Sequence, residues 1–230
     1  ALYSGNFTPP NSAILFTATN ETTILALTGS TFKNSATANT STLFTTAGDV
    51  RISPFTPTAT VNWTTSTIGS AYFDTADNYL SLPASINFQF PGDFTIEGWM
   101  WFTNIGGGSP QSLISIRSSP NWFDVRWFTT RWQISLNSGG GTDIGTTPAP
   151  INNSWIHVAC VRSGSSIRLY VNGVSTGVTL TDSSTLGYSN LNLGIGADVA
   201  GSNQLSGYIS NLRIVNGTAV YTTNFTSSTG

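Results

Sequence analysis

Charged side chains are scarce in this sequence. Only 8% of its 230 residues are Asp, Glu, Lys or Arg, whereas an ordinary soluble domain has about 25%. The eight basic and ten acidic residues are spread singly, so no basic stripe could neutralise phosphate groups or an anionic membrane surface. This pattern excludes nucleic acid as an expected partner and predicts a solvated surface of hydroxyl and amide groups.

Cysteine and histidine are rarer still, with Cys160 and His157 as single copies. One cysteine excludes an intramolecular disulfide, and the two residues together are too few for a zinc-type ligand cluster. The sequence also lacks a phosphate-binding loop and a GxSxG nucleophile elbow. We expect Cys160 to behave as a small buried hydrophobe and His157 as a packed, hydrogen-bonded residue rather than a general base.

Long apolar runs are missing as well. No stretch approaches the roughly 18–20 residues that a membrane-spanning helix needs, and no signal-peptide pattern is present. We therefore expect no membrane insertion. Because position 1 is Ala rather than Met, we expect the chain to be a processed product or an excerpt of a longer protein.

What the chain does contain is a series of short strand patterns, and no stretch keeps a helical period. Phe94–Phe102 is apolar on both faces from Trp99 onward, which predicts a strand that is covered on both sides. Further strands are expected at Ala13–Thr17, Thr23–Leu27, Ala71–Phe73, Tyr79–Leu82, Ser112–Ile116, Phe123–Phe128, Arg131–Leu136, Trp155–Arg162, Ile167–Val171, Leu191–Ile195 and Tyr208–Val215. More than ten short strands with turns between them predict an all-β, antiparallel two-sheet sandwich of jelly-roll type.

The alternation in FDVRWF, at Phe123–Phe128, predicts which residues of this strand face the core. Strict alternation puts Phe123, Val125 and Trp127 on the core face. Asp124 and Arg126 then lie on the opposite face. The predicted core between the sheets is formed by Phe94, Ile96, Trp99, Leu136, Val158, Leu169, Val171, Ile195, Ile209 and Leu212.

Residues 30–65 are rich in Ser, Thr, Ala and Asn. They fit either a flexible linker or a long surface excursion between two strands, which apolar residues such as Phe55 and Trp63 would anchor to the sandwich. We predict the excursion.

The two ends of the sequence resemble each other. ALYSGNFTPP at Ala1–Pro10 and AVYTTNFTSS at Ala219–Ser228 share Ala, Tyr, Asn, Phe and Thr in the same order and spacing. A repeat boundary explains this best. We predict that residues 1–10 close a preceding repeat or form a linker, that 11–218 form one domain, and that 219–230 are a C-terminal tail or linker to a following unit. The alternative is that residues 1–10 form a strand of the same domain.

Several stretches of the sequence resemble the laminin-G-like jelly roll of the concanavalin A-like lectin and glucanase superfamily. They are SAYFDTADNYLSLP at Ser70–Pro83, DFTIEGWMW at Asp93–Trp101, NSWIHVACVRSGSSIRLYVNGV at Asn153–Val174, LNLGIG at Leu191–Gly196 and GYISNLRIVNGTAVYTTNFT at Gly207–Thr226. The resemblance implies a unit of the kind repeated in phage tail or fibre proteins and in bacterial surface proteins. It implies an extracellular or virion-surface location.

Some members of this superfamily hydrolyse glycans with paired carboxylates. The candidate pair here, Asp93 and Glu97, is four strand residues apart, or about 13 Å at roughly 3.3 Å per residue. Retaining and inverting hydrolases need about 5–5.5 Å and 6.5–9.5 Å. We therefore predict that the chain is not an enzyme and that Glu97 is structural.

Two candidate sites remain, and neither is marked by a specific sequence motif. Glycan recognition uses aromatic platforms beside polar groups, and Asn121, Trp122, Asp124 and Arg126 offer this combination, although core packing is an alternative for Trp122. The resemblance also implies calcium at a loop rim. Asp74, Asp77 and Asn78 supply hard oxygen ligands there, with Asp198 a more distant candidate.

The predicted function is a non-enzymatic adhesion or structural module that binds a cell-surface glycan. The alternative is a self-assembling subunit of an extracellular filament or virion shell, in which neighbouring copies associate as a homo-oligomer or tandem array. A glycoside hydrolase is the third possibility.

Overall fold

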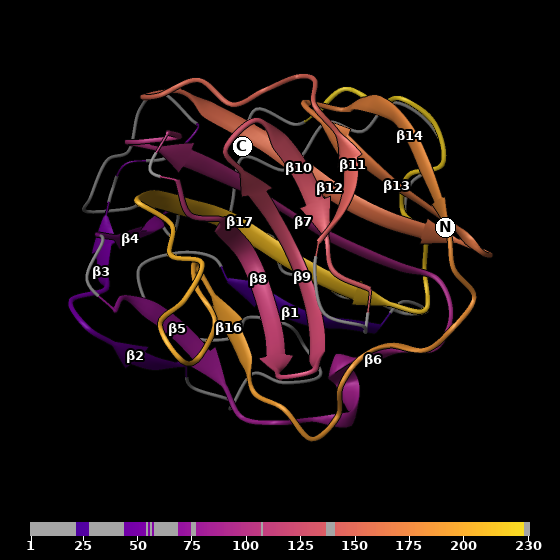
Figure 1. Ribbon diagram of the computed structural model, residues 1–230, viewed down its shortest axis with the longest axis horizontal. Helices are drawn as coiled ribbons and strands as arrows, with labels where there is room; N and C mark the ends of the chain where they lie inside the picture. Colours follow the sequence, from indigo (N-terminus) through magenta and orange to yellow (C-terminus); the bar gives the residue numbers. More distant parts are fainter. Residues whose placement is uncertain are drawn as a thin grey trace.

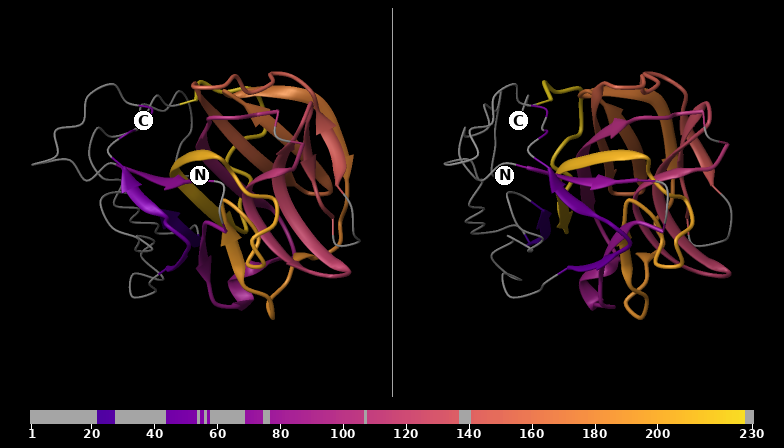
Figure 2. Two further views of the ribbon diagram at one scale, coloured as in Figure 1. Left: turned by 60° about the vertical axis from the view of Figure 1, so that its left-hand side comes forward. Right: turned by 90° about the vertical axis from the view of Figure 1, so that its left-hand side faces the viewer.

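The structure, a computed structural model, describes residues 22–27, 44–53, 55, 57, 69–74, 77–106, 108–136 and 141–227. For residues 22–27 and 52 it describes the backbone alone. Two antiparallel sheets face each other, and in Figure 1 the sheet that holds β8, β9 and β10 lies in front. Figure 2 shows the same two layers from two further directions. This arrangement confirms the predicted all-β sandwich.

The strands have the following bounds. The eight-stranded sheet has the order β14 (Val174–Thr181), β13 (Ser166–Val171), β12 (Trp155–Ser163), β7 (Phe94–Phe102), β17 (Gly207–Asn216), β4 (Ser70–Phe73) and β3 (Arg51–Ser53), with β1 (Thr22–Leu27) also paired to β17. The seven-stranded sheet has the order β11 (Thr142–Gly145), β10 (Arg131–Ile134), β9 (Asn121–Phe128), β8 (Gln111–Ser118), β16 (Leu193–Ile195), β5 (Tyr79–Leu82) and β2 (Thr45–Ala47). Strands β6 (Gln89–Phe90) and β15 (Leu186–Gly187) form a separate pair after a 3₁₀ turn at Ile86–Phe88.

The alternating pattern of β9 is borne out side chain by side chain. Phe123, Val125 and Trp127 are fully buried in the core between the sheets. Trp127 pairs in register with Trp132 of β10, and the two rings meet edge to face at 5.1 Å. Both tryptophans therefore belong to the core, as the period-two pattern predicts.

The central strand β7 is buried on both faces, as its sequence predicts. Its even-numbered residues, such as Ile96 and Met100, face the core. Its outer face carries Thr95, Glu97 and Trp99, and all three are buried. The outer face of β7 is therefore covered by other parts of the chain.

Two residues of the predicted core are not buried between the two sheets as expected. Trp99 is on the outer face of β7, where its ring meets His157 edge to face at 5.2 Å. Leu136 follows the end of β10 and is half-buried against the core. An apolar run with no alternation does not reveal which of its residues face inward, and this explains the error at Trp99. The other eight predicted core residues are buried.

Several strand bounds also differ from the prediction. The strand predicted from Leu191 begins at Leu193, and the one predicted to end at Leu136 ends at Ile134. Strand β14 was not predicted, because VSTGVTLT has few apolar residues and an internal glycine. The predicted strand Ala13–Thr17 lies outside the described residues, as does most of the 30–65 excursion, within which β2 and β3 fall.

The only cysteine lies deep in the sandwich. Cys160 on β12 is fully buried and faces the core between Val158 and Arg162 along the strand. Burial raises the pKa of its thiol to about 12. Cys160 is thus the small buried hydrophobe that the sequence predicts.

Candidate functional site

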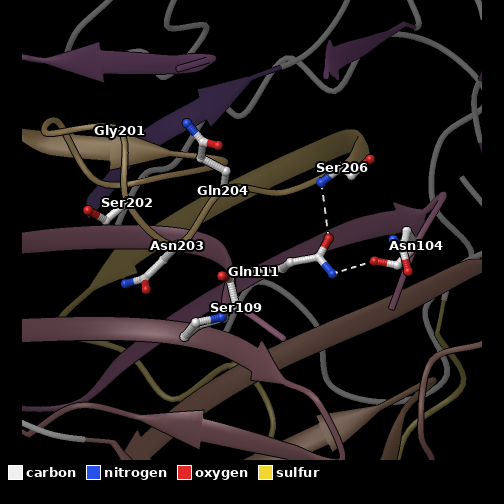
Figure 3. Close-up of a pocket in the computed structure, with 9 residues that line it drawn as sticks. Asn104, Ser109, Gln111, Gly201, Ser202, Asn203, Gln204 and Ser206 are labelled. Carbon is white, nitrogen blue, oxygen red and sulfur yellow. Dashed lines mark hydrogen bonds between the residues drawn. The ribbon is translucent and has the colours of Figure 1, made fainter. Parts of the chain in front are cut away.

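A pocket of about 460 Å³ opens where the β7–β8 loop meets the β16–β17 loop (Figure 3). It falls within the roughly 300–1,000 Å³ range of small-molecule sites. The loops are held together by their backbones, because the Thr103 N–H donates to the Ser206 carbonyl at 2.8 Å. Its lining consists of Asn104, Ser109, Pro110, Gln111, Gly201, Ser202, Asn203, Gln204 and Ser206.

Gln111, the first residue of β8, joins the two loops from below. Its side chain is buried, and Nε2 donates to the Asn104 carbonyl at 2.7 Å. Its Oε1 accepts the Ser206 N–H at 3.0 Å, and both bonds are drawn in Figure 3. Because both ends of this amide are engaged, Gln111 sets the spacing between the loops.

Asp198 fixes the shape of the second loop. Its buried carboxylate accepts the backbone N–H groups of Ala200 at 2.9 Å and of Ser202 at 2.7 Å. Its own N–H donates to the Ser202 carbonyl at 2.9 Å. The turn that presents residues 201–204 to the pocket is therefore closed by one carboxylate.

We expect Asp198→Ala to reduce the free energy of unfolding by about 1–3 kcal/mol, because the backbone N–H groups of Ala200 and Ser202 lose a buried, charged acceptor. Urea unfolding measures this change, and hydrogen exchange should become faster at the Ala200 and Ser202 amides. Asp182→Ala is the matched control, since that carboxylate caps Ser184 on an exposed loop. Unchanged exchange at Ala200 and Ser202 would contradict the assignment.

The chemistry of the pocket is uncharged. Its lining contains amide and hydroxyl side chains and no acidic, basic or aromatic residue. Amides and hydroxyls both donate and accept hydrogen bonds, as sugar hydroxyls do. One donor in the lining, Nδ2 of Asn203, is buried and has no hydrogen-bond partner. The pocket therefore suits a neutral ligand rich in hydroxyl groups, and its lining supplies no acid–base pair for hydrolysis.

The four residues predicted to bind a glycan lie at another place, on β9. Asn121 is exposed at the start of the strand, and Trp122 is half-buried beneath the guanidinium of Arg117, 4.2 Å from the ring centre. Asp124 and Arg126 are buried on the same face as Trp122. Asn121 and Trp122 thus form the accessible edge of this set, and glycan binding there stays a prediction.

Asp124 is the centre of an internal polar network. Its carboxylate accepts hydrogen bonds from the hydroxyls of Ser115 and Ser135 and from Arg126, whose Nη1 lies 3.3 Å away. Burial raises the pKa of Asp124, against the opposing effects of Ser115 and the nearby arginines. Arg126 also donates to Gln133 Oε1 at 3.2 Å. These groups are engaged with one another and are not free for a ligand.

Arg117 links this network to the pocket. Its Nη1 lies 4.0 Å from Asp124 on the neighbouring strand and 3.6 Å from Asp198 in the pocket loop. The same guanidinium covers one face of Trp122. Arg117, on β8, therefore supports the β16–β17 loop that lines the pocket.

The residues considered for calcium do not present converging oxygens. The Asn78 amide donates to Asp74 Oδ1 at 2.5 Å and accepts the Asp49 N–H at 2.7 Å. Asp77 points elsewhere and accepts a hydrogen bond from Gln204 at 3.3 Å. Among the described residues no group of three or more His, Cys, Asp or Glu side chains could hold a metal. Calcium binding by Asp74, Asp77 and Asn78 therefore stays a prediction.

Glu97 belongs to an ion-pair cluster on the outer face of the eight-stranded sheet. Its Oε1 accepts a hydrogen bond from Arg213 Nε at 2.5 Å, and its Oε2 lies 3.3 Å from His157 Nε2. Burial alone would raise the pKa of Glu97, but Arg213, His157 and Tyr221 together lower it to about 2. Glu97 is therefore ionised at neutral pH and paired.

The two stacked antiparallel sheets define a jelly-roll β-sandwich domain. Residues 74–220 match the model of the concanavalin A-like lectin/glucanases superfamily, and the chain belongs to this family. No curated protein is similar enough in sequence to match the chain. No helix in the described part of the chain is long and apolar enough to cross a membrane.

Several solved structures with the same fold are binding domains. Domain 4 of AbnA, an extracellular GH43 arabinanase from Geobacillus stearothermophilus solved with arabinotriose, has a TM-score of 0.64 at 14% identity, covering 85% of this chain and 94% of that one. The binding domain of botulinum neurotoxin DC in complex with SialylT has a TM-score of 0.58 at 15% identity, with coverage of 84% and 47%. For the binding domain of Paraclostridial Mosquitocidal Protein 1 the TM-score is 0.59 at 14% identity, with coverage of 88% and 50%. The chain spans about half the length of these toxin domains.

Proposed function

We propose that this chain is a non-enzymatic glycan-binding module whose pocket between the β7–β8 and β16–β17 loops takes an uncharged oligosaccharide. The observation that carries the proposal is the lining, in which every polar side chain is an amide or a hydroxyl. Amide and hydroxyl groups cost less free energy to desolvate than charged groups, and they can exchange hydrogen bonds with the hydroxyls of a sugar.

The comparisons support the proposal at the level of fold. One similar domain was solved with arabinotriose and another with SialylT. In this chain the corresponding role would be adhesion at an extracellular or virion surface. The alternative role, self-assembly into a filament or shell, would appear as concentration-dependent association in sedimentation velocity that is lost when residues 1–10 are deleted.

A glycan array tests the ligand class, followed by titration of the best neutral oligosaccharide. We expect Ser202→Ala/Gln204→Ala to weaken binding at least tenfold, because both side chains line the pocket and Gln111 keeps the loops in place. Trp122→Ala, which alters the β9 edge, should leave affinity within about twofold. If Trp122→Ala lost binding while Ser202→Ala/Gln204→Ala bound normally, the site would lie on β9 instead. Failure of the wild-type chain to bind any neutral oligosaccharide would overturn the proposal.

A further inference from the structure

The tail segment, residues 219–227, packs on the outer face of the eight-stranded sheet. It is the yellow segment near β13 in Figure 1. Backbone bonds hold it at both ends: the Val220 N–H donates to Thr95 Oγ1 at 2.9 Å, and the Phe225 N–H donates to the Gly173 carbonyl at 2.9 Å. These two bonds place the segment across β7, β12 and the β13–β14 turn.

Two aromatic side chains of the tail segment cover the ion-pair cluster. Tyr221 lies beside Glu97 and Arg213, where its hydroxyl helps to lower the pKa of Glu97. The Phe225 ring stacks on Tyr221 at 3.6 Å and meets His157 edge to face at 5.9 Å. The tail segment thus recognises a buried charge and an apolar surface at the same time.

Two smaller residues complete the contact. Ala219 packs against the small apolar cluster of Ala159, Val161 and Tyr170. The side-chain oxygen of Asn224 accepts the Ser175 N–H at 2.9 Å, which orients the segment at the start of β14.

The residues that make these side-chain contacts are repeated near the start of the sequence. Ala219, Tyr221, Asn224 and Phe225 correspond to Ala1, Tyr3, Asn6 and Phe7 at a constant shift. The positions that differ are of another kind: Thr222 and Thr223 are exposed, and Val220 uses its backbone N–H, which any residue but proline supplies. Four of the five shared residues thus make side-chain contacts, and the fifth, Thr226, is exposed. Residues 1–8 lie outside the described residues, and it is their sequence that matches.

We propose that this face of the sheet is a peptide-recognition site for the pattern A-x-Y-x-x-N-F-T, and that residues 1–8 of a second copy are its ligand. The tail segment occupies the site within its own chain. Residues 1–8 of another copy replace it, so that Tyr3 meets Glu97 and Phe7 packs on His157. Exchange of one segment for another of like sequence links copies without a new interface. This proposal does not depend on glycan binding at the loop pocket.

A labelled ALYSGNFTPP peptide and the full chain test the proposal by fluorescence anisotropy. In the wild-type chain the tail segment competes at high effective concentration. We therefore expect the peptide to bind the Tyr221→Ala/Phe225→Ala chain at least tenfold more tightly than the wild type. A peptide carrying Tyr3→Ala and Phe7→Ala should not bind. Equal binding to both chains, equal binding of both peptides, or no saturable binding to the variant would overturn the proposal.

Gly173 provides a test of the location. A Cβ at Gly173 would lie 1.9 Å from the Phe225 carbonyl oxygen, whereas a Cβ at Gly164, in the preceding hairpin turn, would meet no atom within 4 Å. Both glycines have positive φ, at +77° and +60°, so alanine causes comparable backbone strain at each. Introduced into the Tyr221→Ala/Phe225→Ala chain, Gly173→Ala should abolish peptide binding and Gly164→Ala should preserve it. Equal effects of the two would overturn the assigned site.

The wild-type chain gives a readout that does not require the variants to fold. Excess ALYSGNFTPP should displace the tail segment and release the Phe225 N–H from the Gly173 carbonyl. We expect hydrogen exchange at the Phe225 amide to accelerate severalfold, while buried β9 amides such as that of Val125 are unaffected. No acceleration at saturating peptide would show that the tail segment is a fixed part of its own domain and would overturn the proposal.

Discussion

Arg213→Met should reduce the free energy of unfolding by about 3–5 kcal/mol, the cost of leaving a buried carboxylate without its partner. Glu97 is 6% exposed and has Arg213 as its closest cation. Methionine keeps the volume and the apolar stem of the side chain, so the loss reports the ion pair rather than a cavity. Urea unfolding measures the change. Arg51→Met is the control, because the Arg51–Asp49 pair is exposed and should be worth less than about 1 kcal/mol.

The same pair predicts how stability depends on acid. The pKa of Glu97 falls from its ordinary value of 4.5 to about 2 in the folded chain. Because folding lowers this pKa, ionised Glu97 stabilises the folded chain at pH values above about 4.5. This contribution is lost as the pH falls from about 4.5 to 2. The wild-type chain should therefore lose more stability across this window than Arg213→Met. Parallel curves for the two chains would contradict the role given to this pair.

Arg162→Met should also cost about 3–5 kcal/mol, because three hydrogen bonds from one buried cation disappear. The guanidinium of Arg162 donates to the carbonyls of Gly92 and Ser184, each at 2.6 Å, and of Phe90 at 2.5 Å. Phe90 lies in β6, Gly92 follows β6, and Ser184 precedes β15, so the arginine ties together the segments around the β6–β15 pair. Without the arginine they lose their shared donor.

Thermal and urea unfolding measure the Arg162 effect. Arg168→Met on the neighbouring strand is the matched control, since that side chain makes one exposed hydrogen bond, to Thr179. We expect the control to stay within about 0.5 kcal/mol of the wild type. A loss in Arg162→Met no larger than in the control would show that water satisfies the three carbonyls.

The fold could be predicted from the sequence because burial on one face leaves a period of two. β9 shows this plainly, with Val125 inward and Asp124 outward. The pattern does not tell how deep an outward residue lies. Asp124 is fully buried because Ser115 on β8 and Ser135, directly after β10, close around its carboxylate. Such burial depends on which residues of other strands lie beside Asp124. The sequence of β9 alone does not contain this information.

The loop pocket could not be predicted in the same way. Thr103 and Ser206 meet although about one hundred residues separate them in the sequence, because β7 and β17 are neighbours in the sheet. Amide and hydroxyl residues in loops carry no periodicity, and in this chain they are common everywhere. Gln111 was missed for that reason, although its amide fixes the distance between the loops.

The burial of Cys160 makes this domain convenient to label. Its thiol is enclosed and protonated at neutral pH, so maleimide reagents should leave the native chain unmodified. Ser109→Cys, on the exposed rim of the loop pocket, would then carry the single reactive thiol. A fluorophore or spin probe attached there would report ligand entry without first removing a native cysteine.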